Sequence, residues 1–185
     1  MLLVLLAAGG CSSGEANPEA SSDASVFASA AVATAPTLAA ATAIGLTNAK
    51  MPLPGLVTGG QPTPQQLAAL REAGFNHFVS LRPAAEDGAG WEETTVGAPS
   101  TFARIAVAGG SGLTRENVEA LERLLAQYGD EPTVLYCASS NRVGALLALR
   151  AAWLEDMPAA EALSLGRAAG MRSLEPAVTE LLGGG

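Results

Sequence analysis

The sequence predicts an α/β domain in which a central, mostly parallel sheet of four to five strands is flanked by helices. Three observations predict this class. Strand, helix and strand signals follow one another over residues 56–81 at the spacing of a βαβ unit, which implies parallel strands. Residues 133–136 are apolar on both faces, as a central parallel strand is. The helix expected over residues 142–154 is apolar almost all round, which suits a helix packed on the sheet and covered from outside.

The βαβ unit has clear helix boundaries. A short strand at residues 56–60 ends in a glycine pair. Thr63 is a good N-cap, Pro64 fits the first helical position, and Gln66 stands where a capping box needs it. Gly74 is a natural end for this helix because glycine adopts the left-handed conformation readily.

The middle of the chain continues the alternation of strands and helices. A second strand is expected at residues 78–81, and a long polar connection follows it over residues 84–100. A short helix is expected within that connection, around residues 91–96. A third strand is expected at residues 101–107, and residues 108–112 form a glycine-rich loop predicted to be flexible.

Helices dominate the rest of the domain. Thr114 caps an amphipathic helix that ends at Gly129. After the fourth strand and the apolar helix described above, Pro158 opens another helix. Ser173 is expected to cap the last one.

Composition separates the chain into parts and excludes some functions. The formal net charge of −8 argues against a nucleic-acid surface and against a broad basic face for anionic lipid. Residues 51–185 have the size of one domain with a single core. Residues 12–50 are rich in Ala, Ser, Thr and Pro without sustained periodicity, which predicts a tether. The two cysteines, Cys11 and Cys137, occur in unrelated contexts, so a disulfide framework is not expected.

The first residues resemble a bacterial lipoprotein signal. Residues 1–8 are an apolar run too short to span a bilayer, and small residues then precede Cys11. No Lys or Arg precedes the run, and Ala8 stands where such signals usually carry Leu. The resemblance implies cleavage before Cys11, lipid attachment to it, and a membrane-anchored protein of the bacterial envelope facing the periplasm or exterior. An ordinary cleaved signal or a plain apolar segment is the alternative.

The segment from Cys137 to Arg142 is the candidate active site. It follows the fourth strand and leads into the apolar helix, so its backbone N–H groups can surround an anion at a helix N-terminus. A thiolate is a nucleophile, and both the N–H groups and Arg142 favour the ionised sulfur. Arg142 can also bind a phosphoryl group in two-pronged fashion. The residues expected to bind the substrate are Ala138, Ser139, Ser140, Asn141 and Arg142.

Cys137 and Arg142, with four residues between them, lie between a strand and a helix, and this arrangement resembles, one residue shorter, the Cys-x5-Arg signature of the cysteine-based protein tyrosine and dual-specificity phosphatases. The flanking segments are similar to the small bacterial dual-specificity-phosphatase-like domains related to the beta-lactamase-hydrolase-like proteins. The resemblance covers about residues 55–182 and implies a cysteine-phosphatase-like fold. It also implies hydrolysis of a phosphorylated small molecule or protein through a phosphocysteine. Its landmarks are GQPT at 60–63, VSLRP at 79–83, ED at 86–87 with Trp91, and LTRENV at 113–118.

The loop departs from the phosphatase pattern at three positions. Tyr136 stands where His usually precedes the Cys, and Val143 stands where Ser or Thr usually follows the Arg. Ser140 replaces a glycine at a sharp backbone turn, where a side chain is strained in a left-handed conformation.

A general acid is not evident from the sequence. The resemblance implies an Asp on residues 106–112, and that segment contains no acid. Asp87, or its neighbour Glu86, is the candidate substitute, and a solvated acidic loop is the alternative. Arg82 is expected to pair with one of these two acids, and His77 is expected to be structural.

Three functions therefore remain open. The first is a cysteine-dependent phosphatase with Cys137 as nucleophile. The second is a rhodanese-like sulfurtransferase, because a Cys in an amide cradle can carry a persulfide and needs no protonated alkoxide leaving group. The third is a catalytically weak anion-binding module. No His, Cys or Asp cluster has metal-ligand spacing, so neither a metal nor another cofactor is expected.

Overall fold

The computed structural model of the chain describes residues 36–184. A five-stranded sheet has the order β1-β2-β5-β3-β4. The antiparallel pair is β1 with β2, and all the other neighbours are parallel. The predicted fold class, a mostly parallel sheet flanked by helices, is confirmed. The strands are β1 (Lys50–Leu53), β2 (Leu56–Gly59), β3 (His77–Ser80), β4 (Thr101–Arg104) and β5 (Thr133–Tyr136).

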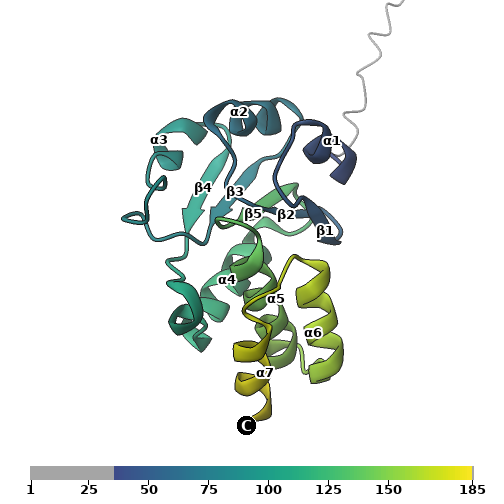
Figure 1. Ribbon diagram of the computed structural model, residues 1–185. Coiled ribbons are helices and arrows are strands. Elements are labelled where there is room, and N and C mark those ends of the chain that lie inside the picture. The colour runs from purple at the N-terminus through teal and green to yellow at the C-terminus, as the bar shows by residue number, and fades with distance from the viewer. Residues whose placement is uncertain (1–35, 185) are drawn as a thin grey trace, which may run out of the picture. The chain divides into compact units, whose positions relative to one another are not determined.

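Helices cover both faces of this sheet (Figure 1). One face packs against α1, α2 and α3, and the other packs against α4 and α5, with α6 and α7 against α5. None of the helices among residues 36–184 combines the length and the hydropathy needed to cross a membrane. The helices are α1 (Leu38–Ala43), α2 (Pro64–Glu72), α3 (Glu92–Val96), the 3-10 turn η1 (Gly109–Gly112), α4 (Arg115–Tyr128), α5 (Asn141–Leu154), α6 (Ala159–Ala168) and α7 (Glu175–Gly183).

The central strand β5 separates two hydrophobic cores. Val134 and Tyr136 belong to the core under α1 to α3, whereas Leu135 and Cys137 belong to the core under α4 and α5. This alternation is the two-residue period of an extended strand. It directs the side chain of Cys137 towards α5, the helix that its own loop introduces.

Side-chain caps explain where two of the helices begin. The Thr63 hydroxyl accepts from the Gln66 N–H at 3.2 Å, and the Gln66 side chain accepts from the Thr63 N–H at 2.9 Å. The predicted capping box is therefore confirmed. Thr114 caps α4 in the predicted way by accepting from the N–H of Asn117 at 3.3 Å.

The structure corrects the predicted N-terminal boundary of the domain. Helix α1 and the first residue of β1, Lys50, lie within residues 12–50, which we predicted to be a tether. Ala41 and Leu46 are buried, and a Cβ atom built on Gly59 would lie 2.8 Å from the Leu46 side chain. The prediction failed because α1 is short and Ala-rich, so it shows no clear apolar stripe. Burial in the core that also contains Val57 of β2 orders this segment instead.

Two smaller predictions were also wrong. The strand predicted at residues 101–107 is β4, and it ends at Arg104. The glycine-rich loop at residues 108–112 contains the 3-10 turn η1. Ser173 does not cap α7, because the N-cap position is Leu174 and has no side-chain cap. The Ser173 hydroxyl instead accepts from the side-chain amide of Asn141 at 2.8 Å. A serine near a helix start indicates a cap only when no other donor competes for its oxygen.

Candidate active site

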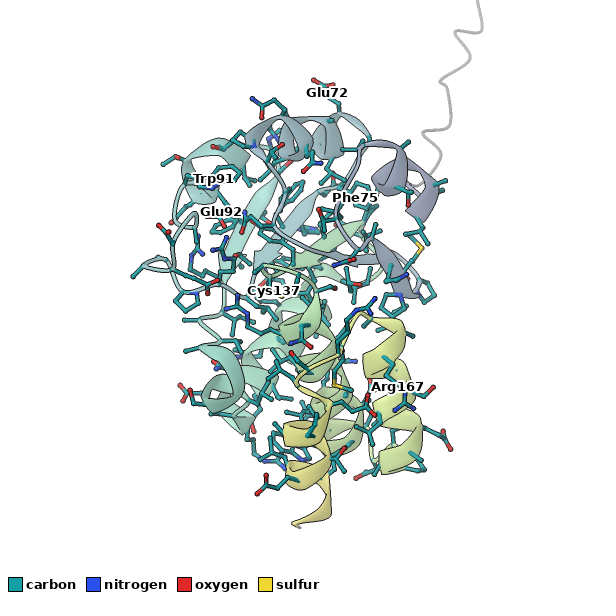
Figure 2. All side chains as sticks on the ribbon, viewed as in Figure 1. Glu72, Phe75, Trp91, Glu92, Cys137 and Arg167 are labelled. Carbon is teal, nitrogen blue, oxygen red and sulfur yellow. The ribbon has the colours of Figure 1, made fainter. Side chains whose placement is uncertain are left out.

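Cys137 lies directly after the central strand, where the sheet meets α5 (Figure 2). Its side chain is buried, with 1% of the residue exposed, and its N–H donates to the Gly59 carbonyl at 3.3 Å. The extension of β2 then runs beside the loop, since Gly60 forms a bridge with Ser139. A Cβ atom on Gly60 would lie 2.9 Å from the Ala138 carbonyl oxygen, so this close approach requires glycine.

The carbonyl groups of the loop point to neighbouring segments. The Ala138 carbonyl accepts from the Gln61 N–H at 3.4 Å, and the Ser139 carbonyl accepts from the Asn48 side-chain amide at 3.1 Å. In a trans peptide the N–H points opposite to the C=O, so the N–H groups of Ser139 and Ser140 turn away from those partners. For residues 138–142, no backbone N–H donates to any residue of the range 36–184. These donors are free to bind an anion.

Ser140 adopts the left-handed backbone conformation in which a side chain is strained and for which a glycine is usual. Its φ is 71° and its ψ is −8°, a region that disfavours a side chain. Its hydroxyl donates to the Ala169 carbonyl at 2.8 Å, and a Cβ atom on the neighbouring Gly170 would approach that hydroxyl to 2.8 Å. The Ser140 side chain is therefore fixed against the turn after α6. Only the backbone N–H of this predicted substrate-binding residue remains available to a ligand.

Asn141 uses its side chain to hold the segment that leads into α7. Its Oδ1 atom accepts from the N–H groups of Arg172 at 2.7 Å and Leu174 at 3.4 Å, and its Nδ2 atom donates to Ser173. These contacts commit the Asn141 amide to the α6–α7 connection. The predicted binding role of Asn141, like that of Ser140, thus depends on its backbone N–H.

Arg142 is held in place by Glu86. Its Nη1 and Nη2 atoms donate to the two carboxylate oxygens of Glu86 at 2.6 and 2.8 Å, and Nη1 also donates to the Val107 carbonyl at 2.9 Å. The same carboxylate accepts from Nε of Arg82 at 2.8 Å, which confirms the predicted pairing of Arg82 with an acid of this loop. A forked carboxylate–guanidinium pair fixes the plane of the arginine as well as its position.

The ion pairs keep both partners charged. The hydrogen bond from Arg142 is the main cause that lowers the pKa of Glu86 from 4.5 to about 2, and Arg82 adds to it against the effect of burial. The hydrogen bond to Glu86 raises the pKa of Arg142 in turn, with a further contribution from the nearby Cys137. Glu86 occupies the edge formed by the two terminal nitrogens of Arg142. The N–H groups on the other edge, formed by Nε and Nη2, form no hydrogen bond to a nitrogen or oxygen atom of residues 36–184, and Cys137 is close enough to this guanidinium to contribute to its raised pKa.

A buried ion pair anchors the loop that carries Glu86. Arg104 donates from Nη2 to Glu92 at 2.8 Å and from Nη1 to the Arg82 carbonyl at 2.6 Å. Glu92 accepts from the Gly90 N–H at 2.8 Å and is fully buried. Burial is the largest single effect on Glu92 and opposes its ionisation, but the hydrogen bonds from Arg104 and from backbone N–H groups, together with the charge of Arg104, outweigh it, so the pKa is lowered. One ion pair therefore holds both ends of the segment 82–90.

Sequence reasoning missed this anchor. Glu92 belonged to a connection interpreted as polar and exposed, and Arg104 was assigned to a strand without a partner. The alternation within β4 offered a weak signal, because a charged residue in a strand under a helix needs a countercharge nearby.

Tyr136 does not replace the histidine of the resembling motif. Its side chain lies in the core under α1 to α3, on the face opposite to Cys137. Its hydroxyl is buried and has no hydrogen-bond partner among the residues that the structure describes. Burial raises the pKa of Tyr136, and the charge of Glu92 raises it further. The hydroxyl thus stays protonated away from the nucleophile.

Asp87 and His77, two candidates from the sequence, lie in different parts of the structure. Asp87 is exposed, and its backbone carbonyl accepts from Nη2 of Arg82, so its role as general acid stays a prediction. His77 lies at the start of the interior strand β3, at the opposite end of the strands from Cys137. Its ring stacks on Tyr128 with centroids 3.9 Å apart and contacts Thr101 and Glu131 at 2.7 and 3.2 Å. These contacts agree with a structural role for His77.

Two further predictions concern residues or clusters away from the loop. Cys11, the predicted lipidation site, lies outside the described residues. Within the range 36–184, no group of three or more His, Cys, Asp or Glu side chains is placed to hold a metal ion.

Comparisons with solved structures agree with this architecture. A protein from Shewanella putrefaciens CN-32 described as "Putative phosphatase (DUF442)" superimposes with a TM-score of 0.60 at 22% identity, over 76% of this chain and 94% of that one. A "putative phosphatase" from Neisseria meningitidis z2491 gives a TM-score of 0.57 at 23% identity, over 71% and 94% of the two chains. The chain has a protein tyrosine phosphatase-like fold.

A third solved structure also has a similar fold. Tk-PTP in its active form superimposes with a TM-score of 0.51 at 17% identity, over 72% of this chain and 95% of that one. No family model matches the sequence, and no curated protein matches it either. At these identities the likeness establishes the protein tyrosine phosphatase-like fold, and the chemistry of the loop must be argued from its own residues.

Proposed function

We propose that this protein is a cysteine-dependent phosphatase that hydrolyses phosphate esters through a phosphocysteine at Cys137. One observation carries the proposal. A buried sulfur, a row of unpaired backbone N–H groups and the free edge of Arg142 occur together within residues 137–142. Nucleophile and anion-binding donors in one short loop are what phosphoryl transfer requires.

The reaction follows from the roles of these groups. The Cys137 thiolate attacks phosphorus, a sulfur–phosphorus bond forms, and the bond to the leaving oxygen breaks with its electron pair remaining on that oxygen. Water then attacks phosphorus, the sulfur–phosphorus bond breaks, and inorganic phosphate leaves with the thiolate restored. The N–H groups of residues 138–142 and Arg142 bind the phosphoryl oxygens, whose negative charge they stabilise in the transition state.

Glu86 supports this chemistry by positioning Arg142. Its two oxygens accept hydrogen bonds from Nη1 and Nη2 of Arg142, which leaves the edge formed by Nε and Nη2 to face a ligand. Because Glu86 is itself held by Arg82, the site carries two arginines for one carboxylate. The excess positive charge favours a bound dianion in a chain whose net charge is −8.

Hydrolysis of an aryl phosphate tests the proposal. We expect the wild type to release phosphate and Cys137→Ser to lose this activity, because a hydroxyl at the same place is a far weaker nucleophile. The same change at the other cysteine, Cys11→Ser, is the matched control and should leave the rate in detergent solution unchanged.

An assay with thiosulfate and cyanide distinguishes a sulfurtransferase from the proposed phosphatase. Wild-type protein that forms thiocyanate from thiosulfate and cyanide, but releases no phosphate from aryl phosphates, would contradict the phosphatase and favour a persulfide-carrying sulfurtransferase. If wild type and Cys137→Ser are equally inactive in both assays but still bind vanadate, the phosphatase proposal is also contradicted. The protein would then be an anion-binding module.

A further inference from the structure

The groups around the Cys137 loop limit the substrates of the proposed phosphatase. Resting on that function, we infer that the enzyme acts on aryl and acyl phosphates, whose leaving groups depart as stable anions, and not on alkyl phosphates. The determinant is the supply of protons at the site. An alcohol must be protonated as it leaves, whereas a carboxylate or an acidic phenolate need not be.

The size of this effect is large. A positioned acid accelerates proton transfer to a leaving group by about 10²–10⁴-fold. A carboxylic acid has a pKa of about 4 and a phenol about 10, while an alcohol resembles water, with a pKa of about 16. A site without an acid therefore distinguishes these classes by leaving-group stability alone.

The loop that faces Arg142 from β4 contributes no proton donor. Residues 106–112 contain no acidic side chain. The Val107 carbonyl accepts from Arg142, and the Ser111 hydroxyl donates to the Ala108 carbonyl at 2.8 Å. This segment presents small side chains and occupied polar groups.

The nearest carboxylate cannot act as an acid. Both oxygens of Glu86 accept hydrogen bonds from guanidinium groups, so the side chain is an acceptor and a counterion. Its pKa of about 2 agrees with full ionisation near neutral pH. Glu86 therefore positions Arg142 and has no proton to give to a leaving oxygen.

The other titratable side chains considered above lie elsewhere. Tyr136 faces the opposite side of the sheet, and His77 lies at the opposite end of the strands. Glu92 is fully buried in its pair with Arg104. Asp87 is the remaining competitor. It is exposed, and none of the hydrogen bonds described for residues 36–184 involves its carboxylate.

A series of aryl phosphates with phenols of graded acidity, extended by acetyl phosphate and phosphoserine, tests the inference. The quantity is kcat/KM, because it reports the step in which the leaving group departs. We expect kcat/KM to fall with rising leaving-group pKa as steeply as the uncatalysed reaction measured in parallel. Phosphoserine should react at least about 10²-fold more slowly than the aryl phosphates.

The outcomes separate this inference from the function on which it rests. A shallow dependence in the wild type would overturn the inference while the phosphatase stands. If that dependence becomes steep in Asp87→Asn, Asp87 is the acid. Loss of all turnover, identical in wild type and Cys137→Ser, would remove the phosphatase itself.

Discussion

Replacing Arg142 by lysine is expected to lower kcat/KM for aryl phosphates by about 10²–10³-fold, although the positive charge is kept. Lysine cannot grip both oxygens of Glu86 and still offer N–H groups to a phosphoryl group, because its donors radiate from one atom. In the proposed mechanism Arg142 does both, because one edge holds Glu86 and the other binds the phosphoryl group. Steady-state kinetics and the affinity for vanadate, a pentacoordinate phosphate mimic, measure the loss.

Arg150→Lys is the matched control. Arg150 lies on the same helix and is buried to the same degree, with 14% of its side chain exposed against 12% for Arg142. It pairs with Glu122 and Glu155, away from Cys137. We expect kcat/KM to change less than about threefold in this variant. Equal losses in both variants would mean that the effect of Arg142→Lys comes from the packing of α5 and not from phosphate binding.

Replacing Glu92 by glutamine is expected to reduce the free energy of unfolding by about 3 kcal/mol, since the charge of Arg104 loses its partner in a buried place. Glu92 is fully buried and pairs with Arg104 at 2.8 Å. We expect Glu92→Gln to affect the active site as well. With the anchor weakened at Gly90 and Arg82, Glu86 holds Arg142 less well, so kcat/KM should fall at temperatures where the protein is still folded.

The neighbouring Glu93→Gln provides the control for Glu92→Gln. Glu93 lies in the same first turn of α3 but is exposed. Its substitution should change the free energy of unfolding by no more than about 0.5 kcal/mol. Chemical denaturation monitored by circular dichroism compares the two variants. If they are equally stable, or if Glu92→Gln is destabilised without any kinetic change, the proposed link from the ion pair to Arg142 is wrong.

Local sequence signals predicted much of the fold. The capping box at Thr63, the cap at Thr114 and the fully apolar strand β5 each depend on neighbours within a few residues, so the sequence alone reveals them. The same holds for the spacing of Cys137 and Arg142, which have four residues between them. A strand that ends at Tyr136 and a helix that begins at Asn141 leave room only for a tight loop.

Contacts between distant segments account for what was missed. The fork between Glu86 and Arg142 joins residues 56 positions apart, and the charges of Glu92 and Arg104 meet across α3 and β4. Their sequence neighbourhoods resemble those of solvated charges. Likewise α1 is ordered by burial of Ala41 and Leu46 against the sheet, which its own composition does not reveal.

Ser140 illustrates a departure that the structure accommodates. The sequence indicated strain because a glycine usually stands there. The structure has the left-handed residue, and the hydroxyl bond to Ala169 at 2.8 Å offsets part of its cost. The hydrogen bond from the Ser140 side chain therefore helps to hold the loop in a conformation that would otherwise favour a glycine at this position.

The most direct test of the central claim is the identity of the covalent intermediate. Wild-type protein mixed with an aryl phosphate is quenched in acid during turnover, digested and analysed by mass spectrometry. We predict one added phosphoryl group on the peptide that contains Cys137, and none on that peptide in Cys137→Ser. Turnover with no phosphoryl group on Cys137, or with the group on another residue, would contradict the account.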